Sequence, residues 1–129
     1  MYGPHSLGSE GEKLAAKYLA GKGYRIVARN FRFLRNEIDI VAQDGDELCF
    51  IEVKTRASLD KGHPAEAVTP KKQKEIARAA SGYLAGLENP WINCRFDVVT
   101  ILATLMDGPA IVAYELEHFK AAFMTGEGC

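Results

Sequence analysis

Cysteine is scarce in this sequence, and no stretch of it stays apolar for long. Cys49, Cys94 and Cys129 are an odd number without a Cys-x-x-Cys pair, so we expect two small core residues and one tail thiol. No apolar run approaches the ~20 residues of a membrane span. The first residues also lack the basic-then-apolar layout of a signal peptide. We therefore predict a cytoplasmic protein with no membrane contact.

The composition that remains is ordinary for one globular domain. The chain has 129 residues, of which 47% are hydrophobic and 26% charged, so residues 1–129 are expected to form a single domain. The net charge of −1 hides an uneven distribution. A total so close to zero can leave a basic surface beside an acidic pocket.

Basic residues gather in the first third of the chain. Seven cations and no acid lie in one run, namely Lys13, Lys17, Lys22, Arg25, Arg29, Arg32 and Arg35. Phe31 and Phe33 alternate with the last arginines, which favours a nucleic-acid contact over the alternative of a solvated basic face. Seven acids then fall within residues 36–60, against two cations.

The acidic stretch predicts a β-hairpin with its turn at Asp44-Gly45. This register places Glu37 opposite Glu52 and Asp39 opposite Phe50. Because side chains alternate along a strand, one face would carry four charged residues, Glu37, Asp39, Glu52 and Lys54. The other face would carry the core residues Ile38, Ile40, Ala42, Cys49, Ile51 and Val53. A three-residue turn would add a bulge and change this phase.

Carboxylates at this spacing repel each other, and a divalent cation would resolve the conflict. Mg²⁺ takes oxygen ligands and keeps waters for chemistry. Lys54 would reach the same space, where it would orient a water or stabilise charge on a phosphate oxygen. The alternative is a solvated sheet face on which Glu and Lys side chains pair across the strands.

The remaining elements follow from periodicity and turn residues. We predict helices at 8–20, 69–87 and 117–124, and further strands at 24–28, 95–102 and 111–116. Residues 29–35 would be a basic connection, residues 55–68 a long loop with a solvated His63, and the ends, 1–6 and 125–129, flexible. The order of the main elements is αβββαββ. It predicts an α/β fold in which a helix covers each face of a mixed sheet of about five strands.

Two helical residues have two interpretations each. Glu12 borders the apolar stripe of the first helix and would lean over the sheet, or it completes a capping box with Ser9 at the N-cap. Lys72 falls on the buried stripe of the second helix, one turn before Ile76, and would point towards the sheet. There it suits a phosphate contact, or it covers the helix end as a snorkelling lysine.

These residues together resemble a known family. The set comprises Gly8, Glu12, Asn30, the Glu37-Ile38-Asp39 step, the run 50–56 with its Glu-x-Lys, Lys72-Gln73 and the run 95–99. From about residue 8 to residue 116 the chain looks like the YraN-like family of small uncharacterised bacterial proteins. That family is similar to the PD-(D/E)xK nuclease superfamily and, within it, to Holliday-junction resolvases.

The resemblance implies a restriction-endonuclease-like three-layer core. It implies that Asp39 and Glu52 bind Mg²⁺ or Mn²⁺, that Lys54 is the catalytic lysine and that Glu12 is an accessory catalytic acid. Lys72 would contact the substrate. Phosphate contacts are expected from Arg32, Arg35, Arg56, Lys71, Lys72 and Lys74, with secondary roles for Glu37 and Gln73.

Three functions are compatible with these patterns. The leading hypothesis is a metal-dependent DNA endonuclease that favours branched DNA. The second is a nucleic-acid-binding module on a nuclease-like fold, without cleavage. The third is an interaction protein whose acidic cluster is merely solvated, and in each case a homodimer is left open.

Overall fold

The structure is a computed structural model that describes residues 4–89 and 92–124, with side chains from residue 7. Its elements are α1 (Pro4–Gly21), β1 (Arg25–Phe33), β2 (Asn36–Asp44), β3 (Glu47–Arg56), the 3₁₀ helix η1 (Pro64–Ala67), α2 (Pro70–Ala85), β4 (Asn93–Asp107) and β5 (Ala110–Phe123). No helix in these two ranges is long and apolar enough to cross a membrane.

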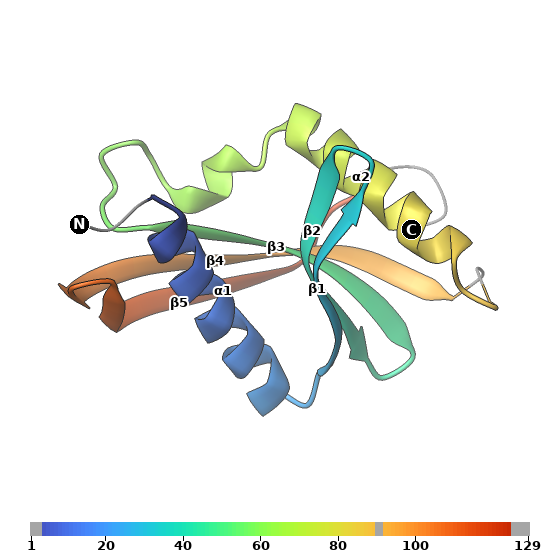
Figure 1. Cartoon of the computed structure of the whole chain (residues 1–129), viewed down its shortest axis with the longest axis horizontal. Helices are drawn as coiled ribbons and strands as arrows, with labels where there is room; N and C mark the ends of the chain where they lie inside the picture. Colours follow the sequence, from blue (N-terminus) through green and yellow to red (C-terminus); the bar gives the residue numbers. More distant parts are fainter. Residues whose placement is uncertain (1–3, 90–91, 125–129) are drawn as a thin grey trace.

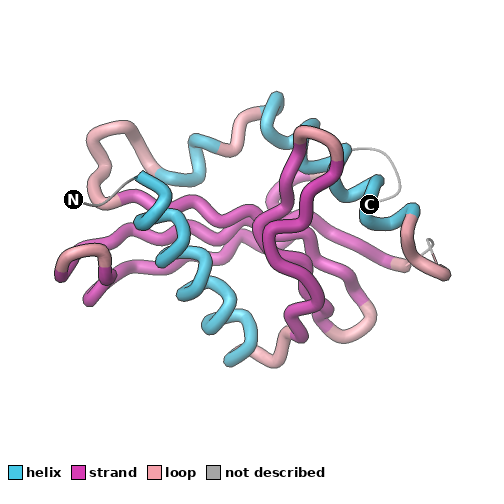
Figure 2. Tube along the Cα trace, viewed as in Figure 1, coloured by secondary structure: helices cyan, strands magenta, loops and turns pink. Residues whose placement is uncertain are grey.

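The five strands form one mixed sheet in the order β1-β2-β3-β4-β5 (Figure 1). Neighbouring strands are antiparallel except β3 and β4, which are parallel and are joined by a crossover through η1 and α2. In Figure 2 the β1–β2 hairpin rises across the direction of the other three strands. The α/β class and the predicted order αβββαββ are confirmed.

Each face of the sheet packs against one helix. Ala15 and Leu19 of α1 are buried in a cluster with β2, β3 and β4, and Ile76 and Ala80 of α2 are buried in a second cluster on the opposite face. Burial of these apolar side chains holds the two helices in place. The predicted helix–sheet–helix sandwich is therefore present.

The two helices differ in how well their starts were predicted. Thr69 caps α2, its Oγ1 accepting from Lys72 N at 3.3 Å, with Pro70 in the first turn as expected. By contrast α1 begins at Pro4, so residues 4–6 are helical instead of a flexible lead. Ser9 lies inside α1 and is no N-cap. The capping-box interpretation of Glu12 is therefore wrong.

The basic connection predicted at residues 29–35 is also wrong, because β1 continues to Phe33. Phe33 pairs with Asn36, so a two-residue turn at Leu34-Arg35 joins β1 directly to β2. A bulge in β1 between Ile26 and Ala28 accompanies the strong bend of this hairpin. The bend carries the outer half of the hairpin towards α2.

The central hairpin turns one residue later than predicted. Asp44 pairs with Glu47, so the turn is Gly45-Asp46, with Gly45 at a φ of 60° that glycine adopts easily. Ile40 pairs with Ile51, and continuing this register aligns Asp39 with Glu52 instead of Phe50. The predicted pairing of Glu37 with Glu52 is likewise wrong, because the ladder with β3 ends before Glu37, whose strand partner is Arg32 of β1.

The ladder between β2 and β3 ends at the Ile40–Ile51 pair, which opens a fork between the two strands. Beyond it, the backbone N–H of Val53 donates to Oδ2 of Asp39 at 2.7 Å, so a side chain takes the place of the strand partner. The alternation of β2 changes at the same point. Ile38 packs in the cluster below α2, whereas Ile40 packs in the cluster below α1, contrary to the single face predicted for both.

The closing helix predicted at residues 117–124 is instead the second half of β5, which runs to Phe123. The buried Asp97 of β4 explains part of this extension. It accepts from His118 Nε2 at 2.8 Å, from Ala121 N at 2.9 Å and from Arg95 Nε at 3.0 Å. The expected arginine partner of Asp97 is thus Arg95, and the network fixes β5 beside β4.

Candidate active site

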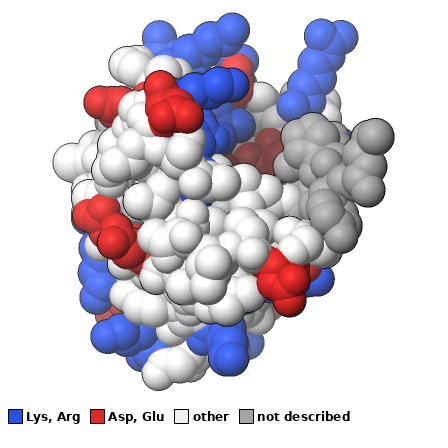
Figure 3. Space-filling view, turned by 90° about the vertical axis from the view of Figure 1, so that its left-hand side faces the viewer, with Lys and Arg blue, Asp and Glu red and all other residues white. Residues whose placement is uncertain are grey.

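The fork between β2 and β3 opens into a cleft of about 650 Å³. Side chains from both helices and three strands line it, namely Ser9, Glu12, Arg29, Asn30, Arg32, Glu37, Asp39, Glu52, Val53, Lys54 and Lys72, beside Gly8. Figure 3 shows Lys and Arg side chains gathered above a hollow in which acidic atoms are visible. The folded chain therefore combines acids on the inside with cations around them.

Asp39 and Glu52 are the innermost acidic pair of this cleft. Oδ2 of Asp39 accepts from Val53 N at 2.7 Å, and the carboxyl group of Glu52 lies near enough to disfavour the ionisation of Asp39. Burial, and after it the neighbouring Glu52, raises the pKa of Asp39 to about 8, against a lowering by the hydrogen bond from Val53 N and the charge of Lys54. Glu52 itself is only 4% exposed. The alternative interpretation, in which these charges lie on a solvated sheet face, is therefore wrong for Glu52.

Two lysines approach this pair from different elements. Lys72 of α2 places its Nζ 3.4 Å from Oε2 of Glu52, as an ion pair, and that oxygen accepts no hydrogen bond from the described residues. Lys54 of β3 lines the same cleft and lowers the pKa of Asp39 by its charge. Lys72 thus points towards the sheet, as predicted from its place on the helical stripe.

Glu12 enters the cleft from α1 and faces the acids of the hairpin. Burial raises the pKa of Glu12 to about 7, with further contributions from the charges of Asp39 and Glu37, against a lowering by Arg29. A carboxyl group with this pKa can accept or release a proton near neutral pH.

Asn30, one of the residues that carry the family resemblance, joins two of these acids, a role that its place in the sequence does not predict. With its amide nitrogen turned towards them, Asn30 donates to Glu12 Oε1 and to Glu37 Oε1, both at 2.9 Å. Its backbone has a φ of 52°, a left-handed conformation that asparagine tolerates better than most residues. An Asn within a predicted basic connection was the available signal, but only the strand geometry reveals its bridging position.

The donor set fits a small, hard divalent cation held by few protein ligands. Asp39 and Glu52 offer carboxylate oxygens, and Oε2 of Glu52 is buried with only a lysine opposite it. Within residues 7–89 and 92–124, no three His, Cys, Asp or Glu side chains are arranged to hold a metal ion. Mg²⁺ characteristically binds through one or two carboxylates and retains several waters. A two-carboxylate site is therefore adequate for it.

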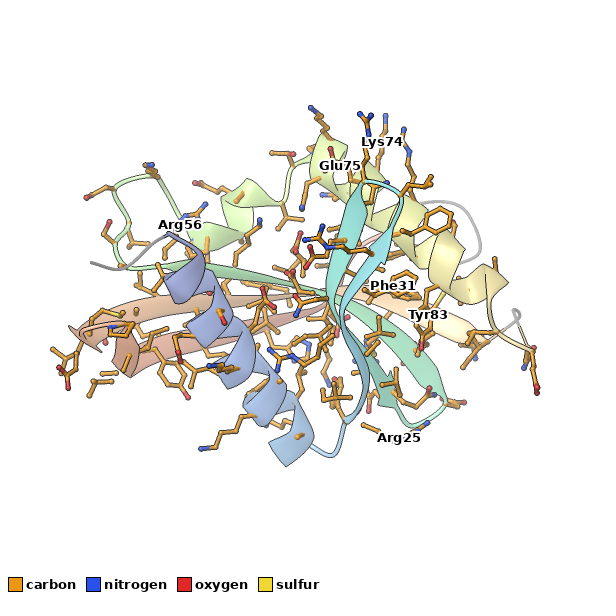
Figure 4. The ribbon with its side chains drawn as sticks, in the orientation of Figure 1. Arg25, Phe31, Arg56, Lys74, Glu75 and Tyr83 are labelled. Carbon is orange, nitrogen blue, oxygen red and sulfur yellow. The ribbon has the colours of Figure 1, made fainter. Side chains whose placement is uncertain are left out.

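Several residues predicted to contact DNA lie outside this cleft. Lys71 and Lys74 lie on the exposed side of α2, and in Figure 4 Lys74 and Glu75 point outward from that helix. Arg35 lines a separate groove between the hairpin tip and α2. These cations extend the basic surface around the cleft instead of forming part of it.

Arg56 and Gln73 have local structural contacts. Arg56, at the end of β3, donates from Nη1 to the carbonyl oxygen of Thr55 at 3.3 Å. Gln73 donates from Nε2 to the carbonyl oxygen of Val68 at 3.2 Å, which ties α2 to the segment before it. His63, expected to be solvated, bonds Glu117 at 2.9 Å and caps η1.

Comparison with known proteins identifies the family. The profile of the uncharacterised protein family UPF0102 matches residues 11–101. The chain belongs to the UPF0102 family. A UPF0102 protein of Chlorobaculum tepidum is 69% identical over 127 residues, covering 98% of both chains. A more distant UPF0102 protein, from Symbiobacterium thermophilum, is 54% identical over 95 residues, covering 74% of this chain and 80% of the relative.

The UPF0102 match spans almost every lining residue of the cleft. Residues 11–101 include Glu12, Asp39, Glu52, Lys54 and Lys72, and of the lining residues they leave out only Gly8 and Ser9 of α1. The predicted membership of a YraN-like family is thereby confirmed. The names of the UPF0102 relatives state no activity, so the nuclease likeness stays a prediction.

Proposed function

We propose that this protein is a Mg²⁺- or Mn²⁺-dependent DNA endonuclease whose active site is the cleft at the β2–β3 fork. The observation that carries the proposal is the placement of Asp39 and the buried Glu52 in one cleft, with Lys72 3.4 Å from Glu52 and Lys54 lining the same cleft. A pair of carboxyl groups forced together in this way is better satisfied by a divalent cation than by a proton.

Each residue of the cleft would have its own role in the hydrolysis of a phosphodiester. Asp39 and Glu52 would hold the cation, which supplies Lewis-acid stabilisation of charge on the phosphate oxygens and a more acidic water. Lys54 would orient the attacking water, and Glu12, whose pKa is about 7, would take up or return its proton. Lys72 would exchange its ion pair with Glu52 for a phosphate oxygen.

DNA is the substrate class that the surrounding charge favours. Arg29 and Arg32 line the cleft above the acids, and Arg35, Lys71 and Lys74 continue the basic surface over the hairpin tip and α2. Such cations bind phosphates without reading sequence. The proposal includes a preference for branched DNA and a cytoplasmic location, where bacterial DNA lies.

A cleavage assay tests the proposal. Labelled four-way, flapped and linear DNA would be incubated with the protein in Mg²⁺ or Mn²⁺, with Glu52→Gln and a matched Glu10→Gln variant. Glu10 is an acid of α1 whose described partner is Lys13, at 3.4 Å. We expect cutting by the wild type and by Glu10→Gln, and a loss of at least about 100-fold in Glu52→Gln, the scale of a lost electrostatic contact in an active site. Equal cutting by all three proteins, or by none, would contradict the proposal.

A nucleic-acid-binding module without cleavage is the second candidate. The observation in its favour is that no metal cluster of three protein side chains occurs in the described part of the chain. In the same assay, this candidate predicts that all three proteins bind the DNA and that none of them cuts it. Their binding should not depend on the metal ion.

A further inference from the structure

The tip of the β1–β2 hairpin presents a large apolar side chain to solvent. Leu34 is 84% exposed, more than any other large hydrophobic residue described. Arg32 and Arg35, both exposed, lie on either side of it in the sequence. Leu34 borders the groove beside Glu75 and Arg78 but keeps most of its side chain in solvent, so burial in the core does not explain its presence.

Leu34 also has an unfavourable backbone. Its φ is 57°, at the first position of a two-residue turn where glycine is the favoured residue. A positive φ is an outlier for a bulky residue, and such strain collects at ligand clamps and other functional positions. The turn thus keeps an exposed leucine where glycine would fold more easily.

The hairpin tip is fixed firmly against α2. Phe31 packs edge-on against Tyr83, with ring centroids 5.1 Å apart, and both are seen side by side in Figure 4. Phe33 lies so close to α2 that a Cβ atom at Gly82 would collide with its ring. Because its neighbours are anchored, Leu34 projects from a rigid support.

The same strand connects this tip to the acidic pair. Asp39 lies five residues after Leu34, at most ~17 Å along a strand. That length corresponds to about five base pairs of a duplex. Arg32, whose Nη2 lies 3.4 Å from Glu37 Oε2, stands between the tip and the cleft. A phosphate backbone that follows β2 from the hairpin tip into the cleft would pass the leucine and Arg32.

We propose that Leu34 is a wedge that inserts between base steps at a branch or other opened point of DNA held in the cleft. Apolar side chains that insert into DNA must unstack a base step, at a free-energy cost that is lowest where the bases are already unstacked. The flanking arginines hold the backbone while the leucine occupies the opened step. This inference rests on the proposed function and gives the physical basis for choosing branched over intact DNA.

Binding in EDTA tests the wedge separately from cleavage. The wild type would be titrated with a four-way junction and a linear duplex of equal length, each with 2-aminopurine at the central step. The variants are Leu34→Gly, Leu34→Met and the control Leu59→Gly, since Leu59 is also exposed, at 54%, but lies in the loop before η1. Thermal unfolding of each variant would be measured alongside.

The wedge predicts that Leu34→Gly loses about tenfold of the preference for the junction, the effect of exposing one leucine side chain. Duplex affinity should not change, the junction-dependent rise in 2-aminopurine emission should disappear, and Tm should equal or exceed that of the wild type. Leu34→Met and Leu59→Gly should behave as the wild type.

An unchanged junction preference in Leu34→Gly, equal loss in Leu59→Gly, or a wild type that does not distinguish the two DNA forms would overturn the wedge. Failure of the proposed function gives a different result. If junction binding depends on Leu34 but no DNA is ever cut, the wedge stands and the endonuclease does not. If DNA is cut but Leu34→Gly keeps the preference for the junction, the endonuclease stands and the wedge does not.

Discussion

Asp39 occupies a position in which its ionisation is opposed by burial and by Glu52, so its pKa rises to about 8. Between pH 4 and pH 8 the native state therefore binds more protons at Asp39 than the unfolded chain does. The free energy of unfolding of the metal-free protein should fall as pH rises through this range. Glu12, with its pKa raised to about 7, contributes in the same direction.

The variant Asp39→Asn should flatten this pH dependence. Its amide oxygen can still accept from Val53 N, and its amide nitrogen can donate to Glu52. At pH 8 in EDTA we expect the variant to be more stable than the wild type by at least about 1 kcal/mol, the equivalent of less than one pKa unit. Urea unfolding at pH 5 and pH 8 would measure it, and a variant that is less stable at pH 8 would contradict the interpretation.

Asp97 provides a matched control, because its pKa is shifted in the opposite direction to that of Asp39. Although burial raises the pKa of Asp97, hydrogen bonds from His118, Arg95 and Ala121 N outweigh it, and the pKa is lowered overall. Its stabilisation is therefore present above the unfolded pKa and is lost as pH falls through the folded pKa. Asp97→Asn should destabilise the protein by about 3 kcal/mol or more at pH 7, because it leaves Arg95 partly unpaired.

At the scale of elements, α1 is held close to β3 by Gly11. A Cβ atom at Gly11 would collide with the Thr55 hydroxyl group, whereas a Cβ at Gly8 would meet nothing within 4 Å. The close approach brings Glu12, the next residue, into the cleft. The glycine thus links helix packing to the position of the candidate acid.

Gly11→Ala should lower the free energy of unfolding by roughly 1–3 kcal/mol through overpacking. Gly8→Ala, on the same helix, should instead stabilise the protein by up to about 1 kcal/mol through helix propensity. Urea denaturation of the two variants would show the difference. Equal effects would mean that α1 does not approach β3 through Gly11.

The elements also show which features the sequence could reveal. The start of α2 was predictable because Thr69-Pro70 satisfies local rules of capping. The second half of β5 was not, because its conformation depends on Asp97, more than twenty residues earlier. Ser9 and Glu12 have the spacing of a capping box, but the helix had already begun at Pro4.

The residues of the site were identified more easily than their arrangement. A turn displaced by one residue left Asp39 and Glu52 on one side of the hairpin, because a register change of two positions preserves the alternation. The fork at Asp39 and the bridge made by Asn30 could not be predicted. Both depend on how strongly β1 and β2 bend together, which is a property of the folded sheet.

At the scale of the whole molecule, opposite charges are segregated although the net charge is only −1. Arg32 and Arg35 carry the basic surface from the cleft to the hairpin tip. Changing both to glutamine should weaken DNA binding similarly for all sequences, and should reduce the slope of log K against log salt by up to ~1.8, about 0.9 for each phosphate contact. Fluorescence anisotropy at several salt concentrations would measure this.

Lys17 and Arg25 offer the control for that experiment. Both are exposed cations of the same basic run, but neither lines the cleft or the groove at the tip. Changing both to glutamine removes the same net charge, so a matching loss of affinity and slope would show that only total charge matters. If DNA follows the basic surface from the cleft to the hairpin tip, changing Lys17 and Arg25 should reduce the affinity and the salt slope clearly less than changing Arg32 and Arg35.

Metal-linked stability tests the central claim most directly. If Asp39 and Glu52 form a divalent cation site, millimolar Mg²⁺ or Mn²⁺ at pH 8 should raise Tm of the wild type, because the ion binds the folded state and removes the repulsion between the two carboxylates. Glu52→Gln should show little or no rise, while Glu10→Gln should respond as the wild type. A wild-type Tm that is indifferent to both ions, or a rise that persists unchanged in Glu52→Gln, would contradict the account.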